Sequence, residues 1–218
     1  MKFRPYLLLV AVCAILATVR ASVEEGSSSS SAPKNPTSAQ HSAPNPAGEQ
    51  NSYRNSTFGF RYDVILGWVD RTNEMQPGQK PGVPPSGGQG KVLLGVFERP
   101  PEVSNDSINS GVVIAQESAA SYPGLKTAAD YVAPLTELAT RNGFKVAGDP
   151  SEITIDSRAL VECDFMRESG KVPAYQSTLI LLQKGMIVSF TFIGANADEV
   201  KDLMERLSFQ RPAAGKQK

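Results

Sequence analysis

The fold is decided by residues 179–193, which read Leu-Ile-Leu-Leu-Gln-Lys-Gly-Met-Ile-Val-Ser-Phe-Thr-Phe-Ile. Two runs rich in β-branched, apolar and aromatic residues flank a short turn that ends in Gly185, a pattern typical of a β-hairpin. Both faces of the two strands are rich in apolar residues. We therefore expect the hairpin at the centre of a sheet that is covered on at least one face.

The second strand of this hairpin also predicts which face points inward. Its even positions are uniformly apolar (Met186, Val188, Phe190 and Phe192), whereas its odd positions include Ser189 and Thr191. Because side chains alternate across a strand, the even set should face the main core. The odd set should face a less strictly buried surface.

An amphipathic helix follows the hairpin. Residues 196–199 have the form of a capping box, Asn-Ala-Asp-Glu, which marks the start of a helix. Apolar residues then recur at the spacing of one helical face, at Val200, Leu203, Met204 and Leu207. We expect this helix to cover the sheet.

The first 21 residues have the three-part form of a cleaved signal peptide. Lys2 and Arg4 precede an apolar core from Tyr6 to Ala17, and small residues end the segment at Ala21. An apolar core of this length is short for a membrane span, which needs about 20 residues. We therefore expect an exported protein, secreted, periplasmic or in the cell envelope. The alternative is an uncleaved anchor, which is the only way in which we expect the chain to contact a membrane.

The charge and the cysteine content of the chain exclude some classes of function and of stabilisation. The whole chain has a formal net charge of zero, and removal of the leader, which holds three basic residues and no acidic ones, makes it acidic. No basic stripe remains, so we expect no nucleic-acid partner. The leader contains Cys13, which leaves Cys163 without an internal disulfide partner. Stability must then come from a packed core.

Composition divides the remainder of the chain into three parts. Residues 22–52 form a Ser-, Ala- and Pro-rich segment that we expect to be a disordered tether. Residues 53–211 are expected to form a single α+β domain, and residues 212–218 a frayed tail. Within the domain, residues 73–90 contain many Pro and Gly residues and predict a long surface loop.

Further elements are expected on both sides of that loop. Phe58, Phe60 and Tyr62 alternate with polar residues or Gly, which predicts a short strand with one aromatic face. Strands are also expected at 91–99, 111–116, 144–146 and 159–165. A helix should begin near Thr127 and end at Asn142-Gly143, with Pro134 distorting its first turns.

The order of these elements resembles the PsbP-like superfamily, which includes the photosystem extrinsic subunit PsbP, the small Ran-binding nuclear import factor and secreted bacterial proteins of unassigned function. The residues that carry the resemblance are Phe58-Gly59-Phe60-Arg61-Tyr62 with Gly67-Trp68, the helix before Gly143-Phe144, the central hairpin, and the last helix ending in Ser208-Phe209. The resemblance implies a mainly antiparallel sheet flanked by two principal helices, an α/β/α sandwich. It also implies a docking module rather than an enzyme.

Few residues of the domain suggest chemistry. The only histidine, His41, lies in the tether, which excludes a His-dependent catalytic or zinc site in the domain. Cys163 has the inward parity of its strand, so we expect an inert buried thiol. Glu162 and Asp164 share the opposite face with Arg158, either as a solvated face or as an acid pair. We assign no catalytic, cofactor or metal residue.

Two other features have alternative interpretations. An oxygen-rich loop could hold a weak calcium ion, but its spacing matches no calcium-binding pattern (Glu102, Asn105, Asp106 and Asn109). Trp68 is expected to be a core anchor rather than an exposed binding aromatic.

Three functions remain open from the sequence. The first is an exported, non-catalytic binding or assembly module on a flexible tether, monomeric, with a protein partner and no cofactor. The second is a small-ligand carrier with the 73–90 loop as a lid. The third is a hydrolase that uses only carboxylates such as Glu162 and Asp164. A concave apolar pocket would favour the carrier, and a flat exposed apolar patch would favour the assembly module.

Overall fold

The computed structural model describes residues 51–77, 90–100, 107–168 and 172–210. The predicted signal peptide, almost all of the predicted tether and the predicted tail lie outside these ranges, as do residues 78–89 of the predicted loop. Within the described ranges, no helix combines the length and the apolar character that a membrane span requires.

The fold is α+β, with a mostly antiparallel sheet and two principal helices. Every strand pairing in the described residues is antiparallel. The strands are β1 (Ser52–Asn55), β2 (Phe60–Asp63), β3 (Val69–Asp70), β4 (Lys91–Phe97), β5 (Gly111–Ser118), β6 (Lys145–Val146), β7 (Ser151–Ile155), β8 (Arg158–Arg167), β9 (Ala174–Gln183), β10 (Met186–Gly194) and β11 (Leu207–Phe209). The helices are the 3-10 turns η1 (Ala119–Ser121) and η2 (Ala129–Tyr131), and the α-helices α2 (Val132–Arg141) and α3 (Ala197–Met204).

The predicted hairpin is confirmed at the centre of the large sheet. The strand order is β3-β4-β5-β10-β9-β8-β6, with β7 paired to β8. The β9–β10 turn consists of Lys184 and Gly185, whose φ angles of 55° and 71° are both positive. Positive φ at both central residues is the requirement of the type I′ hairpin turn, and Gly185 meets it without steric cost.

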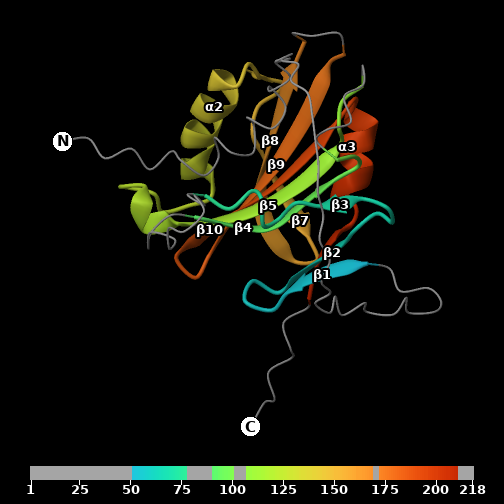
Figure 1. Cartoon of the computed structure of the whole chain (residues 1–218). Coiled ribbons are helices and arrows are strands. Elements are labelled where there is room, and N and C mark those ends of the chain that lie inside the picture. Colours follow the sequence, from blue (N-terminus) through green and yellow to red (C-terminus); the bar gives the residue numbers. More distant parts are fainter. Residues whose placement is uncertain (1–50, 78–89, 101–106, 169–171, 211–218) are drawn as a thin grey trace, which may run out of the picture.

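Both faces of the large sheet are covered, by different elements. Figure 1 shows α2 and α3 on opposite sides of the sheet, with β1 and β2 at its lower end. β1, β2 and β11 form a separate small sheet that packs, with α3, on the face presented by Val188, Phe190 and Phe192. The predicted main core is therefore confirmed on this face. Phe190 is fully buried and meets the ring of Phe60 edge-on at a centroid distance of 5.0 Å.

The expectation of a less buried odd face on β10 is wrong. Ser189 and Thr191 are only 5% and 7% exposed. The reason is a second core on this face, in which α2 packs on residues of β8, β9 and β10. The Thr191 hydroxyl is satisfied inside the protein, because its Oγ1 lies 3.2 Å from Oγ1 of Thr178 on β9.

Both predicted α-helices are present, but the last one is shorter than expected. It ends at Met204, and Leu207 and Ser208-Phe209, which we expected at the end of this helix, form strand β11 because they pair with β2. The first helix buries one apolar stripe, which consists of Tyr131, Leu135, Leu138 and Ala139. This helix begins as the 3-10 turn η2 before α2, and Pro134 lies in the first α-helical turn, where its missing N–H has no intrahelical role. In α3, the Asn196 side chain accepts a hydrogen bond from the Glu199 N–H at 2.8 Å, as the capping-box pattern predicts.

The N-terminal aromatic motif enters the core with one difference from the expectation. Phe58, Phe60 and Tyr62 are each at most 2% exposed. Trp68 packs against the same core but is only partly buried, so it is both an anchor and part of the surface. Leu66, two residues earlier, is 77% exposed.

Candidate functional site

An open pocket of about 640 Å³ lies between α3 and the strands β8 and β9. Its lining is mostly apolar and consists of Ala147, Glu162, Asp164, Phe165, Met166, Tyr175, Gln176, Ser177, Ala197, Val200, Lys201 and Met204. This volume falls within the range of about 300–1,000 Å³ that small-molecule sites occupy.

One wall of the pocket is a single stripe of α3. Its four residues, Ala197, Val200, Lys201 and Met204, are spaced as neighbours on one side of a helix. Val200 also belongs to the main core, whereas Lys201 is exposed. The helix therefore presents apolar surface to the pocket with one cation on it.

The other wall is formed by alternate residues of two paired strands. Glu162, Asp164 and Met166 share one face of β8. The register places Asp164 opposite Ser177 and Met166 opposite Tyr175 on β9. The two carboxylates thus lie side by side on one wall, next to an aromatic ring and a thioether.

Glu162 is the more buried of the two acids. It is partly buried, whereas Asp164 is exposed. Burial raises the pKa of the Glu162 carboxyl above its ordinary value, and the charge of Asp164 raises it further. The Ser177 hydroxyl donates a long hydrogen bond of 3.4 Å to Glu162 Oε1. Within the described residues, no cationic side chain forms an ion pair with either acid.

Of the nearby residues that the sequence singled out, neither Arg158 nor Cys163 joins the acid pair in the pocket. Arg158 lies at the start of β8 and is not part of the pocket lining. Cys163, between the two acids, points to the other side of the sheet and is 3% exposed. The expected burial of this thiol is therefore confirmed, and burial raises its pKa to about 11.

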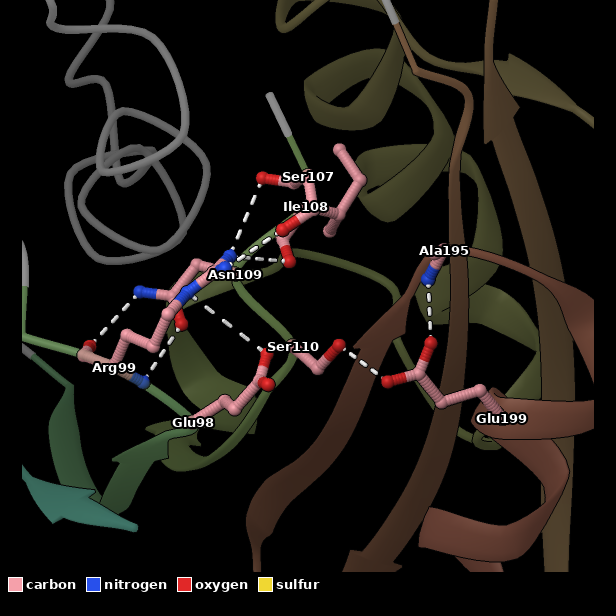
Figure 2. Close-up of polar contacts among 8 residues, drawn as sticks. All are labelled: Glu98, Arg99, Ser107, Ile108, Asn109, Ser110, Ala195 and Glu199. Atoms are coloured by element: carbon pink, nitrogen blue, oxygen red, sulfur yellow. Dashed lines mark hydrogen bonds and ion pairs between the residues drawn. The ribbon is translucent and has the colours of Figure 1, made fainter. Parts of the chain in front are cut away.

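The oxygen-rich loop that we considered for calcium falls mostly outside the described ranges. Glu102, Asn105 and Asp106 lie there, while Asn109 is described and its amide is committed to Arg99. The Asn109 Nδ2 donates to the Arg99 carbonyl at 3.0 Å, and the Arg99 N–H donates to Asn109 Oδ1 at 3.0 Å (Figure 2). Among the residues that the structure describes, no group of three His, Cys, Asp or Glu side chains could hold a metal ion.

A polar contact that the sequence did not indicate fixes the position of α3. The Ser110 hydroxyl donates to Glu199 Oε1, and the Ala195 N–H donates to Glu199 Oε2 at 2.8 Å (Figure 2). Glu199 lies on α3 between the residues that line the pocket, and Ser110 immediately precedes β5. Since a Cβ at Gly194 would lie 3.1 Å from the Glu199 carboxyl carbon, Gly194 leaves the room that this contact needs.

A second polar cluster that the sequence did not indicate lies on the opposite face of the sheet. Glu117 on β5 is 6% exposed and accepts hydrogen bonds from two tyrosine hydroxyls, those of Tyr122 and Tyr131. The Tyr131 contact measures 2.9 Å. Burial raises the pKa of the Glu117 carboxyl, while the two hydrogen bonds act in the opposite direction. The group holds η2 and the segment before it against the sheet.

Comparisons with known proteins give structural matches only. No protein-family model and no curated protein sequence matches the chain. The solution structure of PsbP from the cyanobacterium Synechocystis sp. PCC 6803 matches with a TM-score of 0.47 at 13% identity, covering 77% of this chain and 98% of that one. A crystal structure of LpqN, involved in cell envelope biogenesis of Mycobacterium tuberculosis, matches with a TM-score of 0.36 at 14% identity, covering 69% and 83%.

A third match is a Pseudomonas aeruginosa protein of unknown function described as a putative regulator, with a TM-score of 0.37 at 18% identity, covering 76% of this chain and all of that one. A cyanobacterial PsbP is thus among the solved structures to which this chain is similar, as the sequence motifs predicted. These TM-scores are below 0.5, so function has to be argued from the side chains of the site.

Proposed function

We propose that this chain is a non-catalytic binding module that holds a small, largely apolar ligand in the pocket between α3 and β8–β9. The observation that supports the proposal is the pocket itself, which has the volume of a small-molecule site and a mostly apolar lining. Of the three functions left open by the sequence, a concave apolar pocket favours the carrier.

The arrangement of the acids favours binding over hydrolysis. Glu162 and Asp164 are next-but-one neighbours on one strand and occupy the same wall. A carboxylate-only hydrolase needs two carboxyl groups that flank the reacting bond, about 5–10 Å apart across a cleft. The wall facing Glu162 and Asp164 is α3, whose one charged lining residue is Lys201.

The predicted lid is not part of this proposal. Residues 78–89 lie outside the described ranges, and the described ends of the loop flank β4. Gln76, at one end, donates from Nε2 to the Val92 carbonyl at 2.8 Å. β4 is separated from β8 by β5, β10 and β9 in the sheet order, so these ends do not lie at the pocket.

The proposal also includes export and a flexible tether, and both are supported by sequence patterns. The leader pattern of residues 1–21 supports export, and the composition of residues 22–52 supports a flexible connection that would leave the domain free to bind. A carrier outside the cytoplasm would hold an apolar molecule that dissolves poorly in water.

A second candidate function, docking to another protein, is favoured by one observation. Leu66 is 77% exposed at the turn that precedes the partly buried Trp68. A single large apolar side chain is often this exposed, but here the neighbouring ring of Trp68 enlarges the apolar surface. If this surface docks a protein, a Leu66→Asp substitution should abolish complex formation while ligand binding in the pocket is unchanged.

The carrier proposal is tested by a neutral fluorescent apolar probe, N-phenyl-1-naphthylamine, with variants that fill the pocket. Ala147 and Ala197 are both exposed residues of the lining, so Ala147→Trp and Ala197→Trp place a large ring in the pocket without opening the core. We expect the wild-type chain to bind the probe with enhanced fluorescence, and each variant to bind at least about tenfold more weakly, a loss of about 1.4 kcal/mol.

The matched control is Ala159→Trp, which places the same ring at an exposed position of β8 outside the pocket. It should bind the probe as the wild type does. Absence of probe binding to the wild type, or equal binding by all four proteins, would overturn the carrier proposal.

A further inference from the structure

The charged side chains that line the pocket include more acidic than basic groups. Two carboxylates, Glu162 and Asp164, line it against one ammonium group, that of Lys201. In the described part of the chain neither acid takes part in an ion pair. The pocket therefore has a negative end that its own residues do not neutralise.

One of the two acids, Glu162, is partly shielded from water. Glu162 is partly buried and accepts hydrogen bonds from two neutral hydroxyls, that of Ser177 at 3.4 Å and that of Ser151 on β7. Its like-charged neighbour Asp164 is two residues away on the same face. A cation placed against both carboxylates would relieve their mutual repulsion and add charge-assisted hydrogen bonds, which are stronger than those from neutral hydroxyls.

The remaining lining suits the apolar part of such a ligand. Met166 and Met204 provide flexible thioether side chains that adapt to irregular shapes. Tyr175, opposite Met166 on β9, adds an aromatic ring beside the acids, and rings of this kind attract organic cations. Apolar surface and negative charge thus meet within one pocket.

Resting on the proposed function, we propose that the ligand is a small amphipathic amine, an apolar chain or ring that carries one ammonium group. The apolar part lies against Met166, Val200 and Met204, and the ammonium group lies against Glu162 and Asp164. The volume of about 640 Å³ favours a free small molecule over a single side chain of a partner protein.

The proposal is tested by calorimetric titration of three molecules that share one tail and differ in the head group: octylammonium, octanol and octanoate. With the wild-type chain at low ionic strength, octylammonium should bind at least about tenfold more tightly than octanol, and octanoate more weakly than both. Added salt should reduce the preference, because partly exposed charges are screened. Equal affinity for octylammonium and octanol would overturn the inference, while the proposed apolar binding would stand.

Variants assign the preference to the two acids. Glu162→Gln and Asp164→Asn keep the shapes and remove the charges, and each should reduce the ratio of octylammonium affinity to octanol affinity several-fold. Glu152→Gln is the matched control, because Glu152 is an exposed acid on the neighbouring strand β7 and lies outside the lining. Lys201→Gln should act in the opposite direction and strengthen octylammonium binding.

The outcomes separate this inference from the proposed function. A preference that persists in both acid variants, or that changes equally in the Glu152 control, would overturn the assignment to Glu162 and Asp164. Binding of a blocked lysine, N-acetyl-lysine methylamide, as tightly as octylammonium would overturn the choice of a free small molecule and indicate a partner's lysine side chain. If none of the three octyl compounds binds, the proposed function itself is wrong.

Discussion

The Ser110 hydroxyl donates a hydrogen bond to the Glu199 carboxylate across 89 positions of the chain, and this contact joins the start of β5 to the first turn of α3. The second carboxylate oxygen of Glu199 holds the Ala195 N–H, just before the helix. One side chain therefore fixes the N-terminal end of the helix that forms one wall of the pocket.

Removal of this contact should destabilise the protein and loosen the pocket wall. We expect Glu199→Ala to lower the free energy of unfolding by about 1–3 kcal/mol, the usual cost of leaving partly buried hydrogen-bonding groups without partners. Asp202→Ala, at an exposed position on the same helix, should change it by less than about 0.5 kcal/mol. Denaturant unfolding measures both, and equal effects would show that the Glu199 contact is not a structural tie.

The stability of the protein should depend on pH through Glu117. Its folded-state pKa is raised above the ordinary value of about 4.5, mainly by burial. A carboxyl whose pKa is raised in the folded state stabilises it fully below the unfolded-state pKa, and this contribution is lost as the pH rises through the folded-state pKa. The Glu117→Gln variant, which cannot ionise, should therefore gain stability relative to wild type as the pH rises above about 4.5.

Unfolding of the wild type and of Glu117→Gln at a series of pH values checks this sign. A difference between the two that is independent of pH would show that the Glu117 carboxyl titrates alike in the folded and unfolded states.

The Tyr131→Phe variant tests the hydrogen bond to Glu117 at constant pH. It should lower the free energy of unfolding by about 1–3 kcal/mol, because it removes the 2.9 Å hydrogen bond to a buried carboxyl group.

The central hairpin allows a direct comparison of its two faces. Phe190→Ala should cost about 3–5 kcal/mol, since it empties a fully buried aromatic site between Phe60 and Phe209. Thr191→Ala should cost around 1 kcal/mol, the value of one ordinary hydrogen bond to Thr178. Denaturant unfolding measures the free energy of unfolding of both variants. A larger decrease for Thr191→Ala than for Phe190→Ala would contradict the assigned register.

Cys163 should be chemically inert in the folded protein. Its thiol is 3% exposed, and burial raises its pKa to about 11, so the reactive thiolate is scarce at neutral pH. A thiol reagent such as 5,5′-dithiobis(2-nitrobenzoate) should label it only at the rate at which the protein unfolds. Rapid stoichiometric labelling under native conditions would show that the strand does not hide this side chain.

Local patterns predicted much of this fold. The alternation in β10, the Lys184-Gly185 turn and the Asn196–Glu199 capping box each depend on residues close together in sequence, and all three are present in the structure. The burial of the odd face of β10 could not be predicted in this way. It depends on α2, which is more than 40 residues away in the chain, and Ser189 and Thr191 are typical of a solvated face.

Less of the candidate site than of the fold could be predicted from the sequence. Glu162 and Asp164 were recognised as an acid pair on one strand face, because alternation places them together. The opposite wall could not be assigned, since only the tertiary structure brings Lys201 and Met204 of α3 next to β8. The Ser110–Glu199 contact was hidden for the same reason, because the capping box accounts for Glu199 on its own.

The central claim, that the pocket between α3 and β8–β9 is the binding site, is tested most directly by mapping a bound ligand on the protein. A ¹H–¹⁵N NMR titration of the domain with octylammonium would follow every amide at once. We predict that the largest shifts occur at pocket residues, among them Glu162, Asp164, Ser177 and Lys201, and that the amides around Leu66 do not change. Saturable shifts that centre on Leu66 and Trp68, or no shifts at the pocket, would contradict the claim.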